Sequence, residues 1–580
     1  MNKSSRDALT PFDRQFFTGK EKFTCIGRGA IGGKAQGLAN VRDVLASLNS
    51  RFSPDIQINI PTLTVIASDF FDLFLKDNNL YDIAFSDLRD HQIAHAFQRG
   101  EMPSQLVGDL RALISQVHSP LAIRSSSMLE DAMFEPFASV YTTKMIPNNQ
   151  FDPDIRFRKL LEAVKYVYAS TFFEGAKDYL GVTKHTTADE KMAVIIQEVV
   201  GSQQNKRFYP QISGVARSYN FYPFGHARPE EGVVDLALGL GKSIVDDGMG
   251  WSFSPAYPHV NPPYNSHTDL LKQSQTEFWA INMGEPLYYD PIKETEYMFK
   301  YNLAEAEDDG NLKFIASTYV SEDDKIKIGI GNKGPRILDF APILKLSEIP
   351  LHLVIKELLE LCEKKLDSMV EIEFAVTLDP DRGLPARFGF LQVRPMVVSH
   401  EKVDLSKEDL TGDNVLVASE SVLGNGTMRA IQDVVYIKPD KFEISKTSSI
   451  AKEIEKLNHE LVQTNRPYVL IGFGRWGSSD PSGGIPLKFG QISGAKVIVE
   501  ATLPNMNHML SQGSHFFHNI TSFQVFYFSI AHWDKYRIDW DWLNNQEAIH
   551  EAHYIRHVRP ASPLSIIVDG RKGRGVIGYE

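Results

Sequence analysis

Residues 370–395 predict a β-hairpin, and this hairpin constrains the fold more than any other segment. Two runs rich in β-branched and aromatic residues, VEIEFAV and ARFGFLQVRP, flank the turn residues DPDRGLP. Just before them, residues 351–369 follow Pro350 with apolar side chains at helical spacing and predict an amphipathic helix. A helix followed by a hairpin therefore closes the first part of the chain.

The hairpin groups its polar side chains by face, because residues two apart on a strand point the same way. Glu371 and Glu373 share one face of the first strand. Gln392 and Arg394 share one face of the second. Oxygen ligands on a rigid sheet suit Mg²⁺, and arginine suits phosphate. On spacing alone, a solvated sheet face with surface ion pairs is the more common structure.

A second candidate site lies where a glycine-dense loop, residues 24–33, runs into the helical pattern AQGLANVRDVLASL. Lys34 stands at this junction, where backbone N–H groups and the helix dipole can hold phosphate. The loop is not a Walker A motif, because Arg28 replaces its first glycine and Ala35 follows the lysine. The alternative is an ordinary helix cap with a solvated lysine.

A third candidate is the segment LAIRSSSMLEDAMFEPFASVYTT, in which an apolar strand precedes Arg124, Ser125, Ser126 and Ser127. Hydroxyls and backbone amides clustered after an arginine make good phosphate ligands. The alternative interpretation is a polar turn. We expect Arg124 and Ser125 to contact a phosphate group.

Composition limits the class of protein. The chain has 580 residues, 43% hydrophobic and 23% charged, so three or four globular domains are expected. Its net charge of −12 is spread without a basic block, and no nucleic acid or anionic membrane is expected as a partner. The two cysteines exclude a disulfide framework. No signal peptide or membrane-spanning run is visible, so a cytoplasmic location is expected.

Patterns along the chain favour an α+β or α/β fold. From about 120 to 300, short β-type runs such as LAIRS and KMAVIIQEVV are separated by helical stretches. The polar stretch VDLSKEDLTGDN is interpreted as part of a linker at 401–414. Residues 415–580 begin with β-type runs, VLVASESVLGNGTMRAIQDVVYI, and are expected to form a smaller β-rich domain.

Six motifs occur together in a recognisable order. They are GGKAQGL, AIRSSSMLED with FEPFASVYTT, MAVIIQEVV, ISGVARS, VVDLALGLGKSIVDDG and VEIEFAV with FLQVRPM. In order and approximate spacing they resemble the nucleotide-binding domain of phosphoenolpyruvate synthase and pyruvate phosphate dikinase, over about residues 20–400. The resemblance implies an ATP-grasp-type fold that holds ATP, with Mg²⁺, between a small lid-like subdomain and a larger one.

The resemblance also implies roles for individual residues. Lys34 and Arg124 match the cations that contact phosphate. Glu373 and Gln392 match the pair that binds Mg²⁺. Arg394 matches the arginine that follows them and grips phosphate.

Three further positions carry weaker or altered matches. Glu371 stands where many members carry Asp and is placed with the metal ligands. Gln197 and Glu198 match the adenine-side linker segment. The family's SFAG is here PFAS, with Ser139 in place of glycine, and its GLGE ends in Lys242. A lysine there could still bind phosphate, or it could mean altered chemistry.

Beyond residue 405 the resemblance weakens. The remaining chain is shorter than the roughly 250 residues of the TIM barrel that dikinases carry, so that barrel is expected to be absent. The region resembles a divergent swivelling domain. Its segment SQGSHFFHNITS, with His515 and His518, is the part most similar to the phosphorylated motif of that domain. An exposed imidazole after a Gly-Ser turn can attack phosphorus. A histidine in an ordinary strand-edge turn is an equally good interpretation.

Two other segments of this region are less informative. GFGRWGSSDPSGG, at 472–484, is a glycine-rich surface loop whose Arg475 and Trp476 could grip an acceptor or a phosphohistidine. His550, His553 and His557 lie at helical spacing and predict a solvated helix face rather than a metal site.

Three hypotheses follow. The first is an ATP-dependent phosphotransferase that passes phosphate through His515 or His518 to an unidentified small-molecule or protein acceptor. The second is a kinase of the same fold that phosphorylates its acceptor directly. The third is a nucleotide-binding regulatory protein with a degenerate site, which Ser139 and Lys242 would explain.

Overall fold

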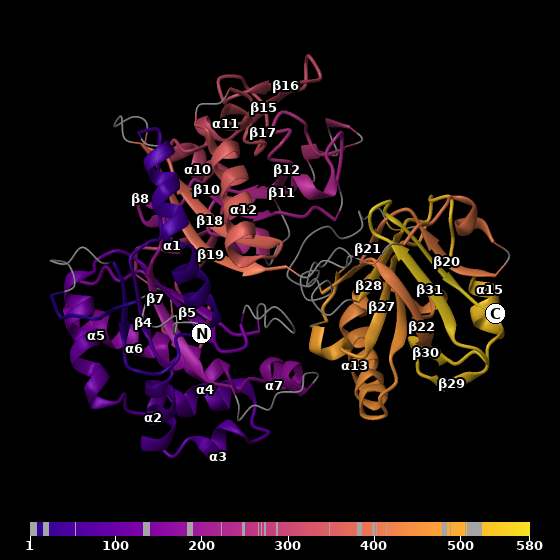
Figure 1. Ribbon diagram of the computed structural model, residues 1–580, viewed down its shortest axis with the longest axis horizontal. Helices are drawn as coiled ribbons and strands as arrows, with labels where there is room; N and C mark the ends of the chain where they lie inside the picture. Colours follow the sequence, from indigo (N-terminus) through magenta and orange to yellow (C-terminus); the bar gives the residue numbers. More distant parts are fainter. Residues whose placement is uncertain are drawn as a thin grey trace. The chain divides into compact units, whose positions relative to one another are not determined.

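The computed structural model divides the chain into two compact units, Met1–Met396 and Val397–Glu580. It describes all residues except 1–8, 16–21, 53, 131–139, 182–189, 222, 246–249, 265, 268–269, 272–273, 286–287, 347–348, 380–384, 397–400, 402, 413, 478–483, 488, 505, 507–524 and 580. Both units mix helices with several sheets, so the fold is a mixed α/β architecture (Figure 1).

Two six-stranded sheets form the framework of the first unit. The strands of the first sheet are, in spatial order, β1 (Thr10–Pro11), β2 (Phe23–Ile26), β4 (Leu63–Ile66), β7 (Met192–Glu198), β5 (Leu121–Ser127) and β6 (Thr143–Ile146). Those of the second are β12 (Trp251–Phe253), β11 (Val233–Ala237), β10 (Ile212–Arg217), β18 (Val370–Thr377), β19 (Ala386–Pro395) and β3 (Ile56–Asn59). The second sheet is antiparallel except where β19 pairs with β3.

Helices and two smaller sheets complete this unit. The longer helices are α1 (Gly32–Phe52), α2 (Asp69–Asp77), α4 (Asp90–Arg99), α5 (Ser104–Gln116), α6 (Pro153–Ser170), α7 (Glu174–Gly181) and α12 (Leu351–Leu366). The shorter ones are α3 (Tyr81–Ala84), α8 (Lys242–Val245), α10 (Leu303–Asp308) and α11 (Ala341–Leu346). The smaller sheets contain β14 (Met298–Asn302), β13 (Glu277–Asn282), β9 (Arg207–Tyr209) and β8 (Ser202–Gln204), and β16 (Lys325–Ile328), β15 (Ser317–Val320) and β17 (Arg336–Ile337).

Helix α1 joins the two large sheets, because it packs on β5 of the first and on β3 and β19 of the second (Figure 1). Its buried residues Leu38 and Val41 belong to one apolar cluster that includes Ile195 of β7 and Val393 of β19. This face follows the helical spacing of the sequence.

The first residue of α1 lies directly against β5. Gly32 has a φ of 75°, and a Cβ added to it would stand 1.7 Å from the carbonyl oxygen of Ser126. Only glycine fits such an approach at a positive φ. The start of α1, and with it Lys34, is therefore fixed by backbone contact with the strand that carries Arg124.

The sequence predictions for the hairpin and its preceding helix are confirmed. Helix α12 ends at Leu366, and β18 and β19 pair antiparallel. The predicted β-type run at 121–125 lies within β5, and the run at 191–200 contains β7.

The second unit is built on a seven-stranded sheet covered in part by α13 (Thr447–Gln463). Its strands are, in spatial order, β21 (Val422–Leu423), β28 (Phe526–Ile530), β27 (Ala495–Ala501), β24 (Tyr468–Phe473), β23 (Asp433–Ile437), β30 (Ile555–Val558) and β29 (Ala548–Glu551). A four-stranded sheet contains β20 (Val415–Ser419), β32 (Arg574–Gly578), β31 (Leu564–Asp569) and β22 (Gly426–Ile431). The remaining elements are β25 (Arg475–Trp476), β26 (Gly484–Ile485) and α15 (Trp540–Asn545).

The prediction of a helix carrying three histidines near the C-terminus is wrong. His550 lies on β29 and His557 on β30, with His553 between these antiparallel strands. The imidazole of His557 is buried, and its Nε2 lies 2.7 Å from Oδ1 of Asp433 on β23. Spacings of three and four residues fit a helix, but tertiary pairing decides the backbone here.

Two other segments of the second unit contain buried apolar side chains that the sequence interpretation did not expect. Leu405 and Leu410, within the stretch interpreted as a linker, are buried in an apolar cluster with Tyr536 and Val576. In the segment at 472–484 that was interpreted as a surface loop, Trp476 on β25 is buried. Apolar side chains inside polar or glycine-rich stretches therefore anchor both segments.

Among the described residues, no helix is both long and apolar enough to cross a membrane.

Candidate functional site

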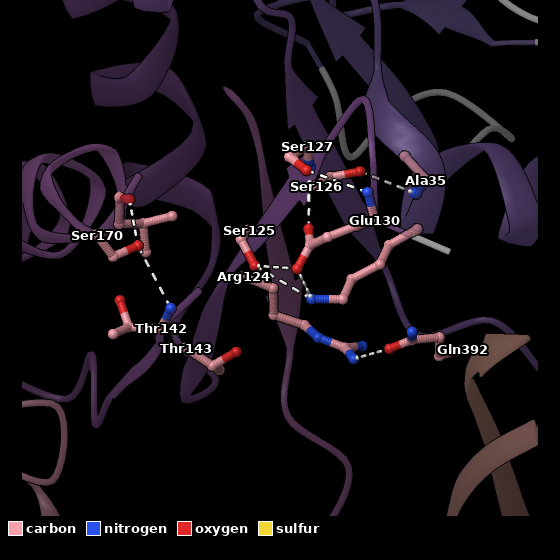
Figure 2. Close-up of polar contacts among 12 residues, drawn as sticks. Ala35, Arg124, Ser125, Ser126, Ser127, Glu130, Thr142, Thr143, Ser170 and Gln392 are labelled. Atoms are coloured by element: carbon pink, nitrogen blue, oxygen red, sulfur yellow. Dashed lines mark hydrogen bonds and ion pairs between the residues drawn. The ribbon is translucent and has the colours of Figure 1, made fainter. Parts of the chain in front are cut away.

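Strand β5 supplies the centre of the candidate site. Arg124 is half-buried, whereas Ser125, Ser126 and Ser127 are fully buried. Ser126 Oγ accepts the N–H of Ala35 at 3.1 Å and donates to the carbonyl of Ile31 at 2.8 Å. The serine run is therefore packed core structure that holds the N-terminus of α1, as Figure 2 shows.

Lys34 does not project into solvent. Its Nζ donates to Oε1 of Glu130 at 2.7 Å and to Oγ of Ser125 at 3.1 Å. The Ser125 hydroxyl in turn donates to the same Glu130 oxygen at 2.9 Å (Figure 2). With side chains 13% and 1% exposed, this ion pair lies in a largely water-free environment.

Glu130 is the residue that sequence reasoning missed. Its Oε2 accepts the N–H of Ser127 at 2.9 Å, while the Glu130 N–H donates to Ser127 Oγ at 3.1 Å. This reciprocal pair is the pattern of a capping box, and the S-x-x-E spacing of residues 127–130 is its sequence signal. Glu130 thus fixes the turn after β5 and also holds Lys34.

Arg124 reaches from β5 to the hairpin of the second large sheet. Its guanidinium donates to Oε1 of Gln392 at 2.7 Å and to the carbonyl of Leu391 at 2.9 Å. A longer contact of 3.4 Å joins it to Oε2 of Glu373. Figure 2 shows the arginine pointing toward Gln392. The structure therefore brings together two positions that are 268 residues apart in sequence.

Glu373 and Gln392 face each other across the hairpin, as directly paired residues of β18 and β19. Glu371 and Arg394 form the next such pair. The predicted convergence of four polar side chains is confirmed in its strand register. The alternative of a solvated sheet face is wrong, because Glu371, Gln392 and Arg394 are at most 5% exposed.

Glu371 is enclosed by two arginines. Its Oε1 accepts from Nε of Arg394 at 2.9 Å and also from Nη2 of that residue. Its Oε2 accepts from Nε of Arg217 at 2.6 Å. Arg217 continues to Asp235 on β11 at 2.9 Å. Burial alone would lower the pKa of Arg217, but the charges of Glu371 and Asp235 raise it above its usual value.

The remaining predicted nucleotide ligands occupy three different surroundings. Gln197 joins the cluster, because its Oε1 accepts from Arg124 at 3.4 Å. Glu198, on the opposite face of β7, accepts from Ser119 at 2.9 Å. Lys242 begins α8, and its Nζ lies 5.9 Å from the ring centre of Trp279 on β13.

The glycine-dense loop is held by α2. The N–H groups of Arg28 and Gly29 donate to the carboxylate of Asp69, each at 2.9 Å, and that of Ala30 donates to Ser68 at 3.0 Å. These amides are satisfied within the protein. The part of the loop expected to cradle phosphate with its backbone therefore serves instead to fix the entry to α1.

The comparison with known families agrees with this geometry. The family described as pyruvate phosphate dikinase, AMP/ATP-binding domain, has a sequence model that matches residues 28–415. The chain belongs to this dikinase family. The match spans Lys34, Arg124 and the whole hairpin, so all the clustered residues lie within the AMP/ATP-binding domain. No curated protein matches the chain.

In this chain, Glu373 and Gln392 present two side-chain oxygen atoms of the kind that would suit Mg²⁺. Glu373 is part-exposed and Gln392 directs its carbonyl oxygen to the same place, as their shared contact with Arg124 shows. Mg²⁺ is usually held by one or two carboxylates, phosphates and water, which suits this pair. Glu371 does not fit, because arginines occupy both of its oxygens. Among the described residues, no group of three or more His, Cys, Asp or Glu side chains is arranged to hold a metal.

Three predicted positions lie outside the described residues. They are Ser139 and the two candidate phosphorylated histidines, His515 and His518. The structure therefore describes Lys34, Arg124 and the hairpin residues of this dikinase family member, but not the two histidines.

Proposed function

We propose that the chain is an ATP-dependent phosphotransferase that binds ATP with Mg²⁺ in its first unit, in an ATP-grasp-type manner, and passes phosphate through a histidine to an unidentified acceptor. The observation that carries this proposal is the cluster of Lys34, Arg124, Glu373 and Gln392. It gathers cations and oxygen ligands from both large sheets within the family-matched segment.

Each side chain has a role that its surroundings support. Lys34 and Arg124 bind phosphate oxygens after exchanging their present protein acceptors, Glu130 and Gln392, for the nucleotide. Charge-assisted hydrogen bonds of this kind are the strong ones in proteins. Glu373 and Gln392 would hold Mg²⁺, which when bound supplies charge neutralisation for the transferring phosphoryl group.

Glu371 has a positioning role in this proposal rather than the metal-binding role expected from sequence. It holds the Arg394 guanidinium in one orientation, while Arg217 holds Glu371 from the other side. A fixed guanidinium loses little conformational freedom on meeting phosphate, so binding costs less entropy.

The proposed relay through His515 or His518 rests on the chemistry of imidazole, because both histidines lie outside the described residues. A phosphorylated imidazole divides one transfer into two steps, and it is stable in base and labile in acid. The first step forms the bond between imidazole nitrogen and phosphorus and breaks the phosphoanhydride bond of ATP. The second transfers the phosphoryl group from nitrogen to an acceptor oxygen.

The test uses ATP labelled separately at the β and γ phosphates, incubated with the full chain, with AMP, ADP and protein-bound label measured. We expect base-stable, acid-labile label on the protein that is lost in His515→Ala and retained in His550→Ala, whose histidine lies on β29. Loss in His518→Ala instead would move the role to that residue. ATP consumption without protein label would show direct transfer, and binding with neither label nor turnover would leave a regulatory protein.

A further inference from the structure

A second carboxyl group lies behind the Lys34–Glu130 pair. Oε1 of Glu190 accepts the N–H of Met128 at 3.1 Å, and Oε2 of Glu130 accepts the N–H of the preceding residue, Ser127, at 2.9 Å. Two carboxyl groups thus bind successive amides of one turn. Both are buried, at 3% exposure for Glu190 and 1% for Glu130.

Among the described residues, the groups around Glu190 supply one cation for two acids. The titratable neighbours of Glu190 in this part of the chain are Glu130 and the phenol of Tyr141, and Lys34 is paired with Glu130. The adjacent Lys191 pairs with Asp72 at 2.5 Å. Burial raises the pKa of Tyr141 well above its usual value, so this phenol stays protonated.

The Glu190 carboxyl is consequently expected to gain or lose its proton near pH 7. Burial raises the pKa of its carboxyl to about 7, interaction with Ser127 offsets part of this rise, and the charge of Glu130 adds to it. Two carboxylates in a site of low dielectric cannot both remain charged without a nearby cation. The ammonium of Lys34 supplies that cation while no nucleotide is bound.

We propose that Glu190 takes up a proton from solvent when nucleotide phosphate draws Lys34 away from Glu130. This inference rests on the proposed function, since it requires Lys34 to bind phosphate. Loss of the ammonium leaves the Glu130 carboxylate uncompensated, and the phosphates add further negative charge nearby. Protonation converts the Glu190 carboxylate to a neutral carboxylic acid and removes one of the two charges. Glu190 is therefore a positioning residue that keeps the turn after β5 intact during binding.

Proton uptake makes nucleotide affinity depend on pH. A ligand whose binding takes up protons binds more weakly as the pH rises. Below the pKa of Glu190 the proton is already present, and affinity is independent of this group. Above about pH 7 we expect affinity to fall by up to about tenfold per pH unit, the limit for one proton.

The direct test is titration calorimetry of the full chain with Mg²⁺ and a non-hydrolysable ATP analogue, in buffers that differ in ionisation enthalpy. The dependence of the observed heat on that enthalpy gives the number of protons exchanged. We expect an uptake of more than about half a proton per nucleotide at about pH 8 and little at about pH 5.5. The analogue prevents protons released by hydrolysis from entering the measurement.

Two variants and a matched control locate the proton. Glu190→Gln mimics the neutral acid, keeps an acceptor for Met128 N–H, and should abolish the uptake while nucleotide still binds. Glu130→Gln removes the competing charge and should abolish it as well. Asp339→Asn changes another buried acid with a raised pKa, one that bonds to Ser317 and Ala341, and should leave the uptake at the wild-type value.

The outcomes separate this inference from the proposed function. Absence of nucleotide binding in the wild type would overturn the proposed function and this inference with it. Binding with heats independent of the buffer at about pH 8 would overturn the inference alone. Uptake that persists in Glu190→Gln would also overturn it, because the proton would then belong to another group.

Discussion

Arg124 on β5 donates a hydrogen bond of 2.7 Å to Gln392 on β19, and this bond is one of those that connect the two large sheets of the first unit. The guanidinium also contacts the carboxylate of Glu373, at 3.4 Å. Phosphate bound by Arg124 would therefore free the two oxygen ligands of the hairpin for Mg²⁺.

The first prediction concerns the cations. Lys34→Ala and Arg124→Ala should each weaken ATP binding by about tenfold or more, the scale of a lost charge-assisted hydrogen bond. Arg51→Ala, in an exposed ion pair with Glu357, is the control and should bind ATP normally. If calorimetry gives an unchanged ATP affinity for both site variants, the nucleotide does not bind at this cluster.

The second prediction concerns Glu373, which is proposed to bind Mg²⁺. Glu373→Gln keeps the side-chain volume and removes a charge, so folding should survive while ATP turnover falls and needs more Mg²⁺. The measurement is a magnesium titration of turnover. Normal activity at ordinary Mg²⁺ concentrations would mean that Glu373 only pairs with Arg124.

The third prediction separates Arg394 from the exposed cations. Arg394→Ala should weaken ATP binding and also lower the free energy of unfolding by roughly 3 kcal/mol, because it removes a guanidinium that neutralises the buried carboxylate of Glu371. Arg51→Ala should change stability by less than about 1 kcal/mol. Denaturant unfolding monitored on both variants checks this, and equal stabilities would contradict the burial argument.

The fourth prediction is a pH dependence of stability. Because the pKa of Glu190 rises from 4.5 to about 7 on folding, the folded state binds the proton more tightly than the unfolded state. Its contribution to stability is full below about pH 4.5 and is lost as the pH rises toward 7, by up to roughly 3 kcal/mol. Relative to wild type, Glu190→Gln should therefore be more stable at about pH 8 than at about pH 4.5. An identical pH profile for both proteins would argue that this carboxyl is not desolvated.

The fifth prediction belongs to the second unit. Burial tends to raise the pKa of Asp433, but His557 and Arg559 lower it below its usual value, so its contribution is present above about pH 4 and is lost in acid. Asp433→Asn should cost on the order of 3 kcal/mol, because it leaves a buried imidazole and a guanidinium without their anion. His550→Ala on the edge strand β29 is the control. Thermal unfolding of the two variants gives the comparison.

The hairpin could be predicted because strand composition, turn residues and the alternation of polar and apolar side chains all indicate the same structure there. Period-two alternation indicated which residues share a face, and the structure pairs Glu373 with Gln392 on the two strands. The order of the family motifs placed Arg124 in the same expected site as this face. The hydrogen bond between Arg124 and Gln392 itself forms only in the folded chain, because the two residues are far apart in sequence.

Other features depend on tertiary packing and left weaker signals. Nothing local marks Glu190 as buried, because its environment is formed by the turn after β5. Glu130 had a readable capping spacing, but its pairing with Lys34 joins residues 96 positions apart. At 550–557 the histidine spacing suits a helix, whereas pairing of β30 with β23 imposes a strand.

The approach of Gly32 to Ser126 has a consequence for how this protein can change by mutation. The position of Lys34 relative to Arg124 depends on main-chain contact between α1 and β5 as well as on the apolar side chains of α1. Gly32→Ala, the smallest possible addition, would push the helix off the strand and misalign both cations. The spacing between α1 and β5 therefore depends on glycine at position 32, because any larger side chain would meet the carbonyl oxygen of Ser126.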